Sequence, residues 1–506
     1  MDSSKKKKTA KNGVHTNGHT YAPVMSEEAL EVSQFTELTT YLGFAVLIVA
    51  GHLRDLYARL TGRSVWTTLK PQRNKKVAPL FKSWENFYYR RIFHRIGDVF
   101  DRPVCSSPGA RLEVVMRERR GTDLVTTGET RELVNLGSYN YLGFADDWES
   151  TCGDTVLRAV EEWPISCGSS RSELGTTTLH RRLEQQMAAF VGKEDAIVFN
   201  MGYGTNSTTI PALVGKGDLI LSDALNHASI VNGCRASGAF IRSFPHNDAG
   251  GLEAALREAI ALGVPRTRRP WKKILVMVEG LYSMEGEICD LKAISAVCKK
   301  YKAYLYLDEA HSIGALGPTG RGACEHCGVS PDDVHVLMGT FTKSFGGMGG
   351  YIAASAQIID HLRATCAGFV SHDAMSCVLC EQISTALTIV EKSDLGARKL
   401  RTLKDNSNFF RSELIKIGLH VYGDYDSPVI PVLLYNPAKI PAFSRECLAR
   451  GLAVVVVGFP ATPLVKGRAR FCVSAGHTLQ DLQDAAAKIK EVADILKIQY
   501  AISPFG

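Results

Sequence analysis

Short apolar runs that end abruptly in polar residues recur through the middle of the chain. They occupy residues 196–199, 219–221, 274–278, 304–307, 334–338 and 430–434. Continuous runs of this length are typical of parallel strands that are buried on both faces. Apolar residues between them recur at helical spacing, as at Leu179, Leu183, Met187 and Val191. This alternation predicts a mostly parallel sheet with helices on both faces, and a smaller α+β unit that begins near Asp394.

Three residues with reactive side chains follow three of these runs. His227 comes after residues 219–221, and Asp308 directly follows residues 304–307. Lys343 lies in the glycine-rich segment GTFTKSFGG after residues 334–338. Open α/β sheets bind ligands at the carboxyl ends of their strands, so these side chains are expected to lie near one another. A lysine there can form a Schiff base with an aldehyde cofactor. An aspartate can keep a pyridine nitrogen protonated, and an imidazole can stack on a flat ring.

Each of these residues alone is more often structural. A loop lysine is commonly solvated, a strand-end aspartate commonly caps a helix, and a lone histidine is commonly a satisfied polar group. Their occurrence together, in this order and each after an apolar run, favours a catalytic site. His311, three residues after Asp308, is placed to hydrogen-bond a ring hydroxyl. The glycine turn NMGYG at residues 200–204 follows another strand and predicts a phosphate cradle.

The chain resembles the α-oxoamine synthases, fold-type I enzymes that depend on pyridoxal 5'-phosphate (PLP). The resemblance covers about residues 87–478 and is greatest to the PLP-carrying second subunits of eukaryotic serine palmitoyltransferases. Other relatives tend to have GTLGK at the lysine. The motifs that carry the resemblance are GTFTKSFG at 339–346, FYYRRIFHRI at 87–96, NLGSYNYLG at 135–143, FPATP at 459–463 and RARFC at 468–472.

The resemblance implies a mostly parallel seven-stranded sheet with helices on both faces, plus a smaller C-terminal α+β domain. It also implies a decarboxylating condensation of L-serine with palmitoyl-CoA to 3-ketosphinganine, the first step of sphingolipid synthesis. The implied catalytic residues are Lys343, His227 and Asp308. The implied cofactor contacts also include His311, Gly202, Tyr203, Ser283 and Thr340, and the implied substrate contacts are Arg470, Asn140 and Tyr139. An arginine fork matches the two oxygens of a carboxylate, although a surface arginine is the alternative for Arg470.

Two segments depart from the pattern of the resemblance. Soluble bacterial relatives have an arginine before the PATP loop, where this chain has Gly458. Residues 369–380 also differ, in a region that normally lines a dimer interface near the cofactor phosphate. The resemblance implies that the partner there is a related first subunit that does not bind PLP. Small activating and regulatory membrane subunits are further expected partners.

The first hundred residues differ in character from the rest. Residues 1–36 are polar, include the run KKKK and are expected to be disordered. Residues 37–100 are expected to be membrane-associated, because residues 38–53 carry no formal charge and basic residues follow them. Sixteen residues is short of the roughly 20 that a spanning helix needs, so a buried or interfacial helix remains an alternative. Residues 84–96 mix aromatic and arginine side chains, which fits either a headgroup layer or packing on the catalytic domain.

The expected organisation has three further parts: an N-terminal arm at residues 101–165, a large PLP-binding domain at 166–393 and a small domain at 394–506. The basic residues that follow the apolar segment favour a catalytic part that faces the cytosol. Together with the lipid product implied by the resemblance, they predict an enzyme of the endoplasmic reticulum membrane.

Composition excludes little but agrees with this interpretation. A chain of 506 residues with 45% hydrophobic content can bury a large core, and a formal charge of +7 is mild for that length. No RNA-binding motif or zinc module accompanies the charge, so nucleic acid is not an expected partner. Thirteen cysteines without a secretory signal fit a reducing compartment. The pairs CEHC at 324–327 and CVLC at 377–380 lack zinc-site spacing, and no metal is expected.

Two other functions remain open. One is an α-oxoamine synthase that uses glycine or alanine, similar to aminolevulinate synthase, although residues 5–8 lack the Arg/Ser-rich amphipathic character of a mitochondrial presequence. The other is a non-catalytic scaffold subunit of a membrane complex. The intact set of Lys343, Asp308 and His227 favours a catalytic subunit over a scaffold.

Overall fold

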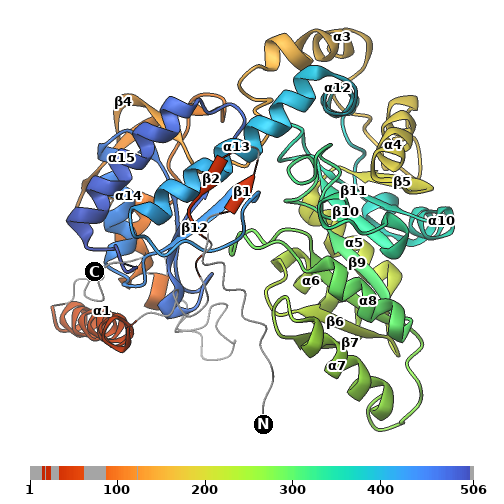
Figure 1. The fold of residues 1–506 in the computed structure, drawn as a ribbon, viewed down its shortest axis with the longest axis horizontal. Coiled ribbons are helices and arrows are strands. Elements are labelled where there is room, and N and C mark those ends of the chain that lie inside the picture. Colours follow the sequence, from red (N-terminus) through yellow and green to blue (C-terminus); the bar gives the residue numbers. More distant parts are fainter. Residues whose placement is uncertain are drawn as a thin grey trace.

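Two domains make up most of the molecule in the computed structural model, which describes residues 14–16, 19–23, 25, 33–61, 87–89, 91–121 and 123–501. Figure 1 shows the large domain beside the smaller C-terminal one, with helices α12 (Cys377–Lys392) and α13 (Asp394–Lys416) leading from one to the other. Helix α13 begins after Ser393, whose side chain accepts a hydrogen bond from the backbone N–H of Gly396. The expected start of the small domain therefore coincides with a capped helix.

A seven-stranded sheet forms the centre of the large domain. Its strand order is β5 (Asp195–Phe199), β11 (Gly350–Ala354), β10 (Val336–Thr340), β9 (Tyr304–Asp308), β8 (Ile274–Glu279), β6 (Leu219–Asp223) and β7 (Phe240–Phe244). Only β11 runs antiparallel to its neighbours. The predicted mostly parallel seven-stranded sheet is confirmed.

Both faces of this sheet are covered by helices. Successive strand residues alternate between two buried clusters, so that Val276 and Leu305 pack on one face while Met277 and Tyr306 pack on the other. Helices α4 (Thr178–Val191), α7 (Ala249–Leu262), α8 (Leu291–Tyr301), α9 (Ala323–Cys327) and α12 contribute to the first cluster. Helices α5 (Gly202–Leu213), α6 (Ala228–Ser237) and α10 (Ala356–Thr365) contribute to the second.

The small domain is built on a three-stranded antiparallel sheet. Its order is β12 (Val429–Leu433), β15 (Arg468–Cys472) and β14 (Val455–Val457), and helices α13, α14 (Lys439–Ala449) and α15 (Leu479–Leu496) pack against it. A second sheet joins β3 (Arg111–Arg120) and β4 (Asp123–Asn135) to β13 (Leu452–Ala453). Within the expected N-terminal arm of the catalytic unit, β4 therefore pairs with a strand of the small domain. Helix α3 (Asp154–Glu162), in the same arm, packs on α12.

Part of the expected disordered tail is ordered in the structure. Strands β1 (Val14–Thr16) and β2 (His19–Tyr21) form an antiparallel pair. The Tyr21 ring is buried, with its centroid 5.6 Å from that of Tyr425, and the N–H of Ala22 donates to Ser412 Oγ at 3.0 Å. These residues have partners on the small domain, which the polar composition of the tail did not indicate. The basic run at residues 5–8 lies outside the described residues.

Helix α1 (Gln34–Leu60) extends well beyond the apolar run at residues 38–53 and lies at the edge of the small domain (Figure 1). It continues through Asp55, which pairs with Arg91. Gly43 faces Pro437 of the small domain. His52 stacks on Phe87 with ring centroids 4.3 Å apart, so the aromatic ring of Phe87 packs against α1. Residues 34–58 are long and apolar enough to cross a membrane, and only 22% of an apolar 18-residue window within them is buried.

Candidate active site

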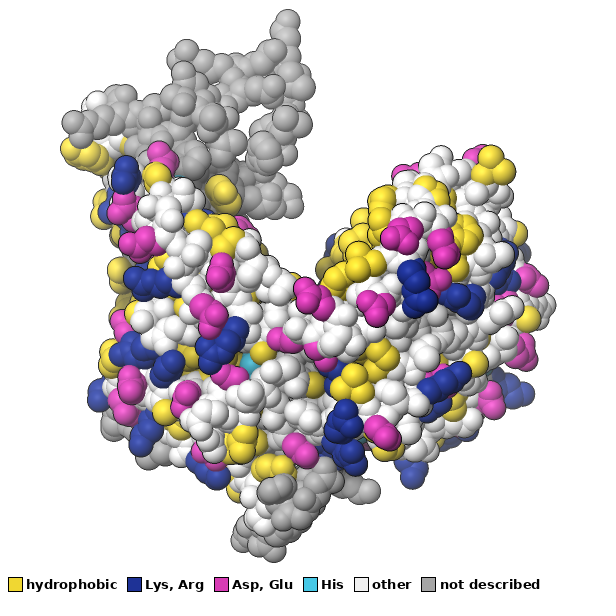
Figure 2. Space-filling model, turned by 90° about the horizontal axis from the view of Figure 1, so that it is seen from above, with side chains coloured by type: hydrophobic (Ala, Val, Ile, Leu, Met, Phe, Trp, Pro, Cys, Tyr) yellow, Lys and Arg dark blue, Asp and Glu magenta, His cyan; other side chains and the backbone are white. Residues whose placement is uncertain are grey.

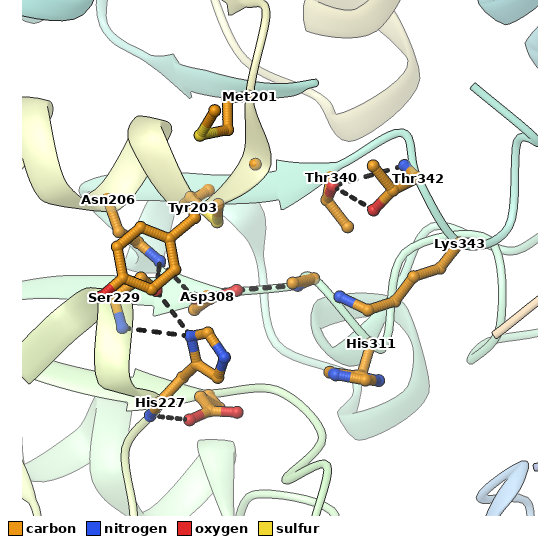
Figure 3. A pocket seen from close by; sticks show the side chains of 14 residues that line it. Met201, Tyr203, Asn206, His227, Ser229, Asp308, His311, Thr340, Thr342 and Lys343 are labelled. Atoms are coloured by element: carbon orange, nitrogen blue, oxygen red, sulfur yellow. Dashed lines mark hydrogen bonds between the residues drawn. The ribbon is translucent and has the colours of Figure 1, made fainter. Parts of the chain in front are cut away.

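A cavity of about 260 Å³ opens where the strands of the large sheet end. Figure 3 shows side chains from several strand ends pointing into it. Figure 2 shows that one face of the molecule is hollowed between two parts, with acidic and basic side chains interspersed around the hollow. The lining residues are Met201, Gly202, Tyr203, Asn206, His227, Ser229, Glu279, Asp308, Ala310, His311, Met338, Thr340, Thr342 and Lys343.

Lys343 enters the cavity from a turn that is held at several points. Thr340 Oγ1 donates to the carbonyl of Gly349 at 2.7 Å, and Ser344 Oγ donates to the carbonyl of Ile313 at 2.8 Å. The rings of Phe341 and Phe345 are fully buried in the core on either side of the lysine. Burial lowers the pKa of Lys343 to about 8, although the nearby carboxylate of Asp308 opposes the shift. The amine is therefore a competent nucleophile and base near neutral pH.

Asp308 lies at the carboxyl end of β9, and its carboxylate is oriented by two donors. Asn206 Nδ2 donates to Asp308 Oδ2 at 2.7 Å, and the N–H of Ala310 donates to Oδ1 at 2.8 Å. Asn206 is in turn fixed by the hydroxyl of Tyr306, which donates to its Oδ1 at 2.8 Å. This chain of hydrogen bonds holds one buried carboxylate at the cavity wall, in an orientation suited to a cationic ring nitrogen.

His227 is the N-cap residue of α6, and its ring faces the cavity (Figure 3). Its Nδ1 accepts from the N–H of Ser229 at 3.2 Å, which assigns the ring proton to Nε2. Burial lowers the pKa of His227, so the ring is neutral at physiological pH. Its backbone N–H donates to Glu279, a fully buried acid whose pKa burial raises well above its ordinary value. A neutral imidazole in this place presents a flat face without a competing charge.

His311 and two tyrosines form the wall beside Lys343. The hydroxyl of Tyr141 lies 2.8 Å from His311 Nδ1, and burial lowers the pKa of this imidazole well below its ordinary value. The Tyr139 ring meets the His311 ring edge-on at 5.1 Å. Lys343 Nζ lies 5.7 Å from the centre of the Tyr139 ring. His311 is thus held neutral and in one orientation at the cavity.

Arg470 reaches the same wall from β15 of the small domain. Its guanidinium lies over Tyr139, 4.8 Å from the ring centre, and its Nε is buried without a hydrogen-bond partner. Among the residues that the structure describes, no carboxylate lies within ion-pair distance of it. A half-buried arginine whose Nε is buried and which lacks an anionic partner is suited to a ligand that carries one.

Four of the sequence-predicted contacts, namely Ser283, Asn140, Tyr139 and Arg470, are not among the cavity-lining residues. Ser283 lies in a turn after β8, and Asn140 lies in a loop where its side chain donates to Asp146 at 2.9 Å and accepts from the N–H of Ala145. Sequence reasoning also missed Asn206 and Glu279. Glu279 had a signal, because it ends the apolar run 274–278 as Asp308 ends 304–307. Asn206 lies within a helix and had none.

The start of α5 has the form of a phosphate cradle and provides a test of whether PLP fits. A Cβ on Gly202 would lie 2.7 Å from Thr340 Oγ1, so glycine keeps this corner open. The preceding N-cap residue, Met201, makes no side-chain cap hydrogen bond, and the first turn of α5 contains no acidic residue. The free backbone N–H groups of this turn favour an anion. With Lys343 and Asp308 across the cavity, the residues present fit a phosphorylated pyridine aldehyde.

The cysteines form no disulfide, and the described part of the chain contains no group of three metal-ligating side chains. Cys324, Cys377 and Cys380 are buried, and burial raises the pKa of the Cys327 thiol to about 11. These thiols behave as core residues. Their surroundings do not activate them.

Comparisons with known proteins agree with this geometry. Residues 131–489 match the family described as aminotransferase class I and II. The chain is 53% identical to long chain base biosynthesis protein 2a of Oryza sativa subsp. japonica, over 92% of this chain and 95% of the relative. It is 46% identical to serine palmitoyltransferase 2 of Dictyostelium discoideum, over 94% of this chain and 97% of the relative.

The fold has also been seen in a solved structure described as SPT with PLP internal aldimine. That structure is 28% identical to this chain, has a TM-score of 0.73, and is matched over 83% of this chain and 98% of its own. A family match over more than half of the chain, with close relatives over nearly all of it, settles the family. The chain belongs to the aminotransferase class I and II family and, within it, to the group that contains serine palmitoyltransferase 2 and long chain base biosynthesis protein 2a.

Proposed function

We propose that the chain is a PLP-dependent acyltransferase that condenses L-serine with palmitoyl-CoA, releasing CoA and carbon dioxide and forming 3-ketosphinganine. The observation that carries the proposal is one cavity lined by Lys343, Asp308 and His227, in a chain whose relatives include serine palmitoyltransferases. A synthase that uses glycine or alanine is less well supported, because the relatives that match nearly the whole chain bear other names.

The residues of the cavity divide the work of binding PLP. Lys343 Nζ would bond to its aldehyde carbon, the start of α5 with Gly202 and Thr340 would receive its phosphate, and Tyr203 lies beside them. Asp308 would pair with its ring nitrogen, His227 would cover its ring face, and His311 would reach its hydroxyl. When bound, PLP withdraws electrons from the carbon beside the substrate amine, which makes the proton on that carbon removable.

Lys343 is the proposed base for that proton. With a pKa of about 8, its amine can accept a proton at Nζ and return it within the physiological range. His227 and His311 are kept neutral by burial, so neither competes as a cation with the substrate amine. Arg470, together with the wall formed by Tyr139, is the proposed site for the serine carboxylate. Asn140 orders the loop that carries Tyr139 and is assigned no direct contact.

We further propose that the chain works at the endoplasmic reticulum membrane, with its catalytic domain in the cytosol and a related subunit that lacks PLP as its partner. Helix α1 supports this proposal, because most of its apolar surface is exposed. The basic residues after it support the orientation. A lipid product also favours a site beside a bilayer, and small membrane subunits are compatible with the same surface.

Replacement of Lys343 tests the proposed function. The complex is purified with its membrane partners, supplied with L-serine and palmitoyl-CoA, and assayed for 3-ketosphinganine by mass spectrometry. Lys343→Ala is expected to abolish the product and the bound-cofactor absorbance. The matched control Lys292→Ala, on the exposed face of α8, is expected to retain both. Product formation by Lys343→Ala at the control rate would refute the proposed role of the lysine.

A further inference from the structure

A short turn lies between the two domains beside the cavity. Residues 282–286, here called the junction turn, follow β8 and are closed by the N–H of Gly286, which donates to the carbonyl of Tyr282 at 2.8 Å. A β-bridge between Leu281 and Ile288 flanks the turn. None of these residues lines the cavity, yet the turn contacts the small domain at the strand that carries Arg470.

Arg468 holds the junction turn from the small domain. Its Nη1 donates to the carbonyl of Met284 at 2.7 Å and lies 3.1 Å from Glu285 Oε1, while its Nε donates to the carbonyl of Lys466 at 3.0 Å. The Arg468 side chain is only 2% exposed. A buried guanidinium with this many partners fixes the turn in place, since loss of either partner leaves a buried charge unpaired.

The large domain holds the segment after the turn. His246 bridges Glu287 and Asp223, with ring nitrogen to carboxylate distances of 2.9 Å and 2.8 Å. Asp223 ends strand β6 of the large sheet. The N–H of Ile288 donates to Asp424 of the small domain at 2.8 Å. The junction turn is therefore held by contacts with both domains, and its position depends on their relative placement.

Arg470 depends on the same turn. It follows Arg468 by two residues on β15, so both side chains leave the same face of the strand. Arg470 Nη1 lies 3.5 Å from Met284 Sδ. Met284 is also the turn residue whose carbonyl accepts a hydrogen bond from Arg468. The same guanidinium lies over the Tyr139 ring. With Nε unpartnered, the contacts with Met284, Tyr139 and Cys472 set the direction of the Arg470 fork.

We propose that Arg468 and Glu285 are positioning residues for the amino-acid substrate, because they fix the junction turn whose Met284 holds Arg470 toward a substrate carboxylate. The inference rests on the proposed function, in which Arg470 binds that carboxylate. Neither residue touches the substrate itself. Their effect is carried through Met284 to the guanidinium, so the affinity for L-serine depends on the contact between the domains.

The test compares two amines on the purified holo complex by the absorbance change of its bound cofactor. L-serine carries the carboxylate, whereas 2-aminoethanol has the same amine and hydroxyl without it. Arg468→Lys is expected to lower the affinity for L-serine about tenfold, which is within the range of interaction energies between coupled neighbouring residues. The affinity for 2-aminoethanol is expected to stay unchanged. Glu285→Ala is expected to behave similarly, and Glu285→Gln, which keeps an acceptor for Arg468, is expected to restore serine binding. The matched control Arg445→Lys alters an exposed pair with Asp98 and is expected to change neither titration.

A double variant completes the test. If Arg468 acts through Arg470, the double variant Arg468→Lys, Arg470→Lys has an affinity for L-serine little lower than that of Arg470→Lys alone. Additive losses, or equal weakening of both amines, would overturn the inference and leave Arg468 a structural residue. If Arg468→Lys does not fold, the two Glu285 variants decide the question. A wild-type complex whose absorbance responds to 2-aminoethanol but not to L-serine would instead refute the proposed function, which separates the two failures.

Discussion

Replacing Asp308 by asparagine removes one charge from the cavity wall at nearly constant volume. The two donors that face this side chain, Asn206 Nδ2 at 2.7 Å and the N–H of Ala310 at 2.8 Å, both require acceptors. An amide offers only one oxygen, so one buried donor is left facing an N–H group. The free energy of unfolding is therefore expected to fall by about 1–3 kcal/mol.

The same change is expected to affect cofactor binding more specifically. Hydrogen bonds to charged groups contribute about 1.5–3 kcal/mol, which corresponds to a loss of PLP affinity of roughly 10- to 150-fold. PLP is titrated by absorbance into the stripped complex, and exchange of the serine α-proton is followed by NMR in deuterated water. The matched control is Asp195→Asn, at the amino end of β5, where the carboxylate pairs with Arg363 at 2.6 Å. An Asp308→Asn variant that matches this control in PLP affinity and exchange rate would show that Asp308 only caps its strand.

Three further predictions follow from the same structure. Because burial lowers the pKa of Lys343 to about 8, about a tenth of its amines are neutral at pH 7, against about 0.03% for an ordinary lysine. The rate at which the stripped complex captures PLP should therefore rise with pH up to about 8 and then level off, and a rise that continues to pH 10 would contradict the shift. Gly202→Ala places a Cβ 2.7 Å from Thr340 Oγ1 and is expected to weaken PLP binding at least tenfold, whereas Gly250→Ala on an exposed helix should not weaken it. Equal PLP affinities of the two variants in a titration would exclude the phosphate cradle. A chain that begins at Trp84 lacks α1 and is expected to lose membrane association in a flotation assay while it still binds PLP; retention on vesicles would place the membrane contact elsewhere.

Most of the large sheet could be predicted because the local sequence pattern identifies its buried strands. Each apolar run from 196–199 to 334–338 became a strand of the sheet, since a strand buried on both faces tolerates few polar residues. Strand β7 escaped prediction because its residues are mostly exposed and include Arg242. Strand β11, with the sequence GYIAA, is short and contains glycine and alanine, which carry little strand signal.

The candidate site was predictable where a residue type and its position at a strand end coincide. Lys343, Asp308 and His227 met both conditions, and the structure brings them to one cavity. Asn206 met neither, because its place beside Asp308 depends on how α5 packs on the sheet. The pairing of β3 and β4 with the small domain likewise depends on contacts between residues more than 300 positions apart, which local patterns do not encode.

The central claim is tested most directly by measuring CoA release with one amino acid at a time. The complex, purified with its membrane partners, is given palmitoyl-CoA together with L-serine, glycine or L-alanine, and free thiol is followed as it forms. The account predicts fast release with L-serine, accompanied by 3-ketosphinganine, and much slower release with the other two. Faster release with glycine or L-alanine than with L-serine would contradict it.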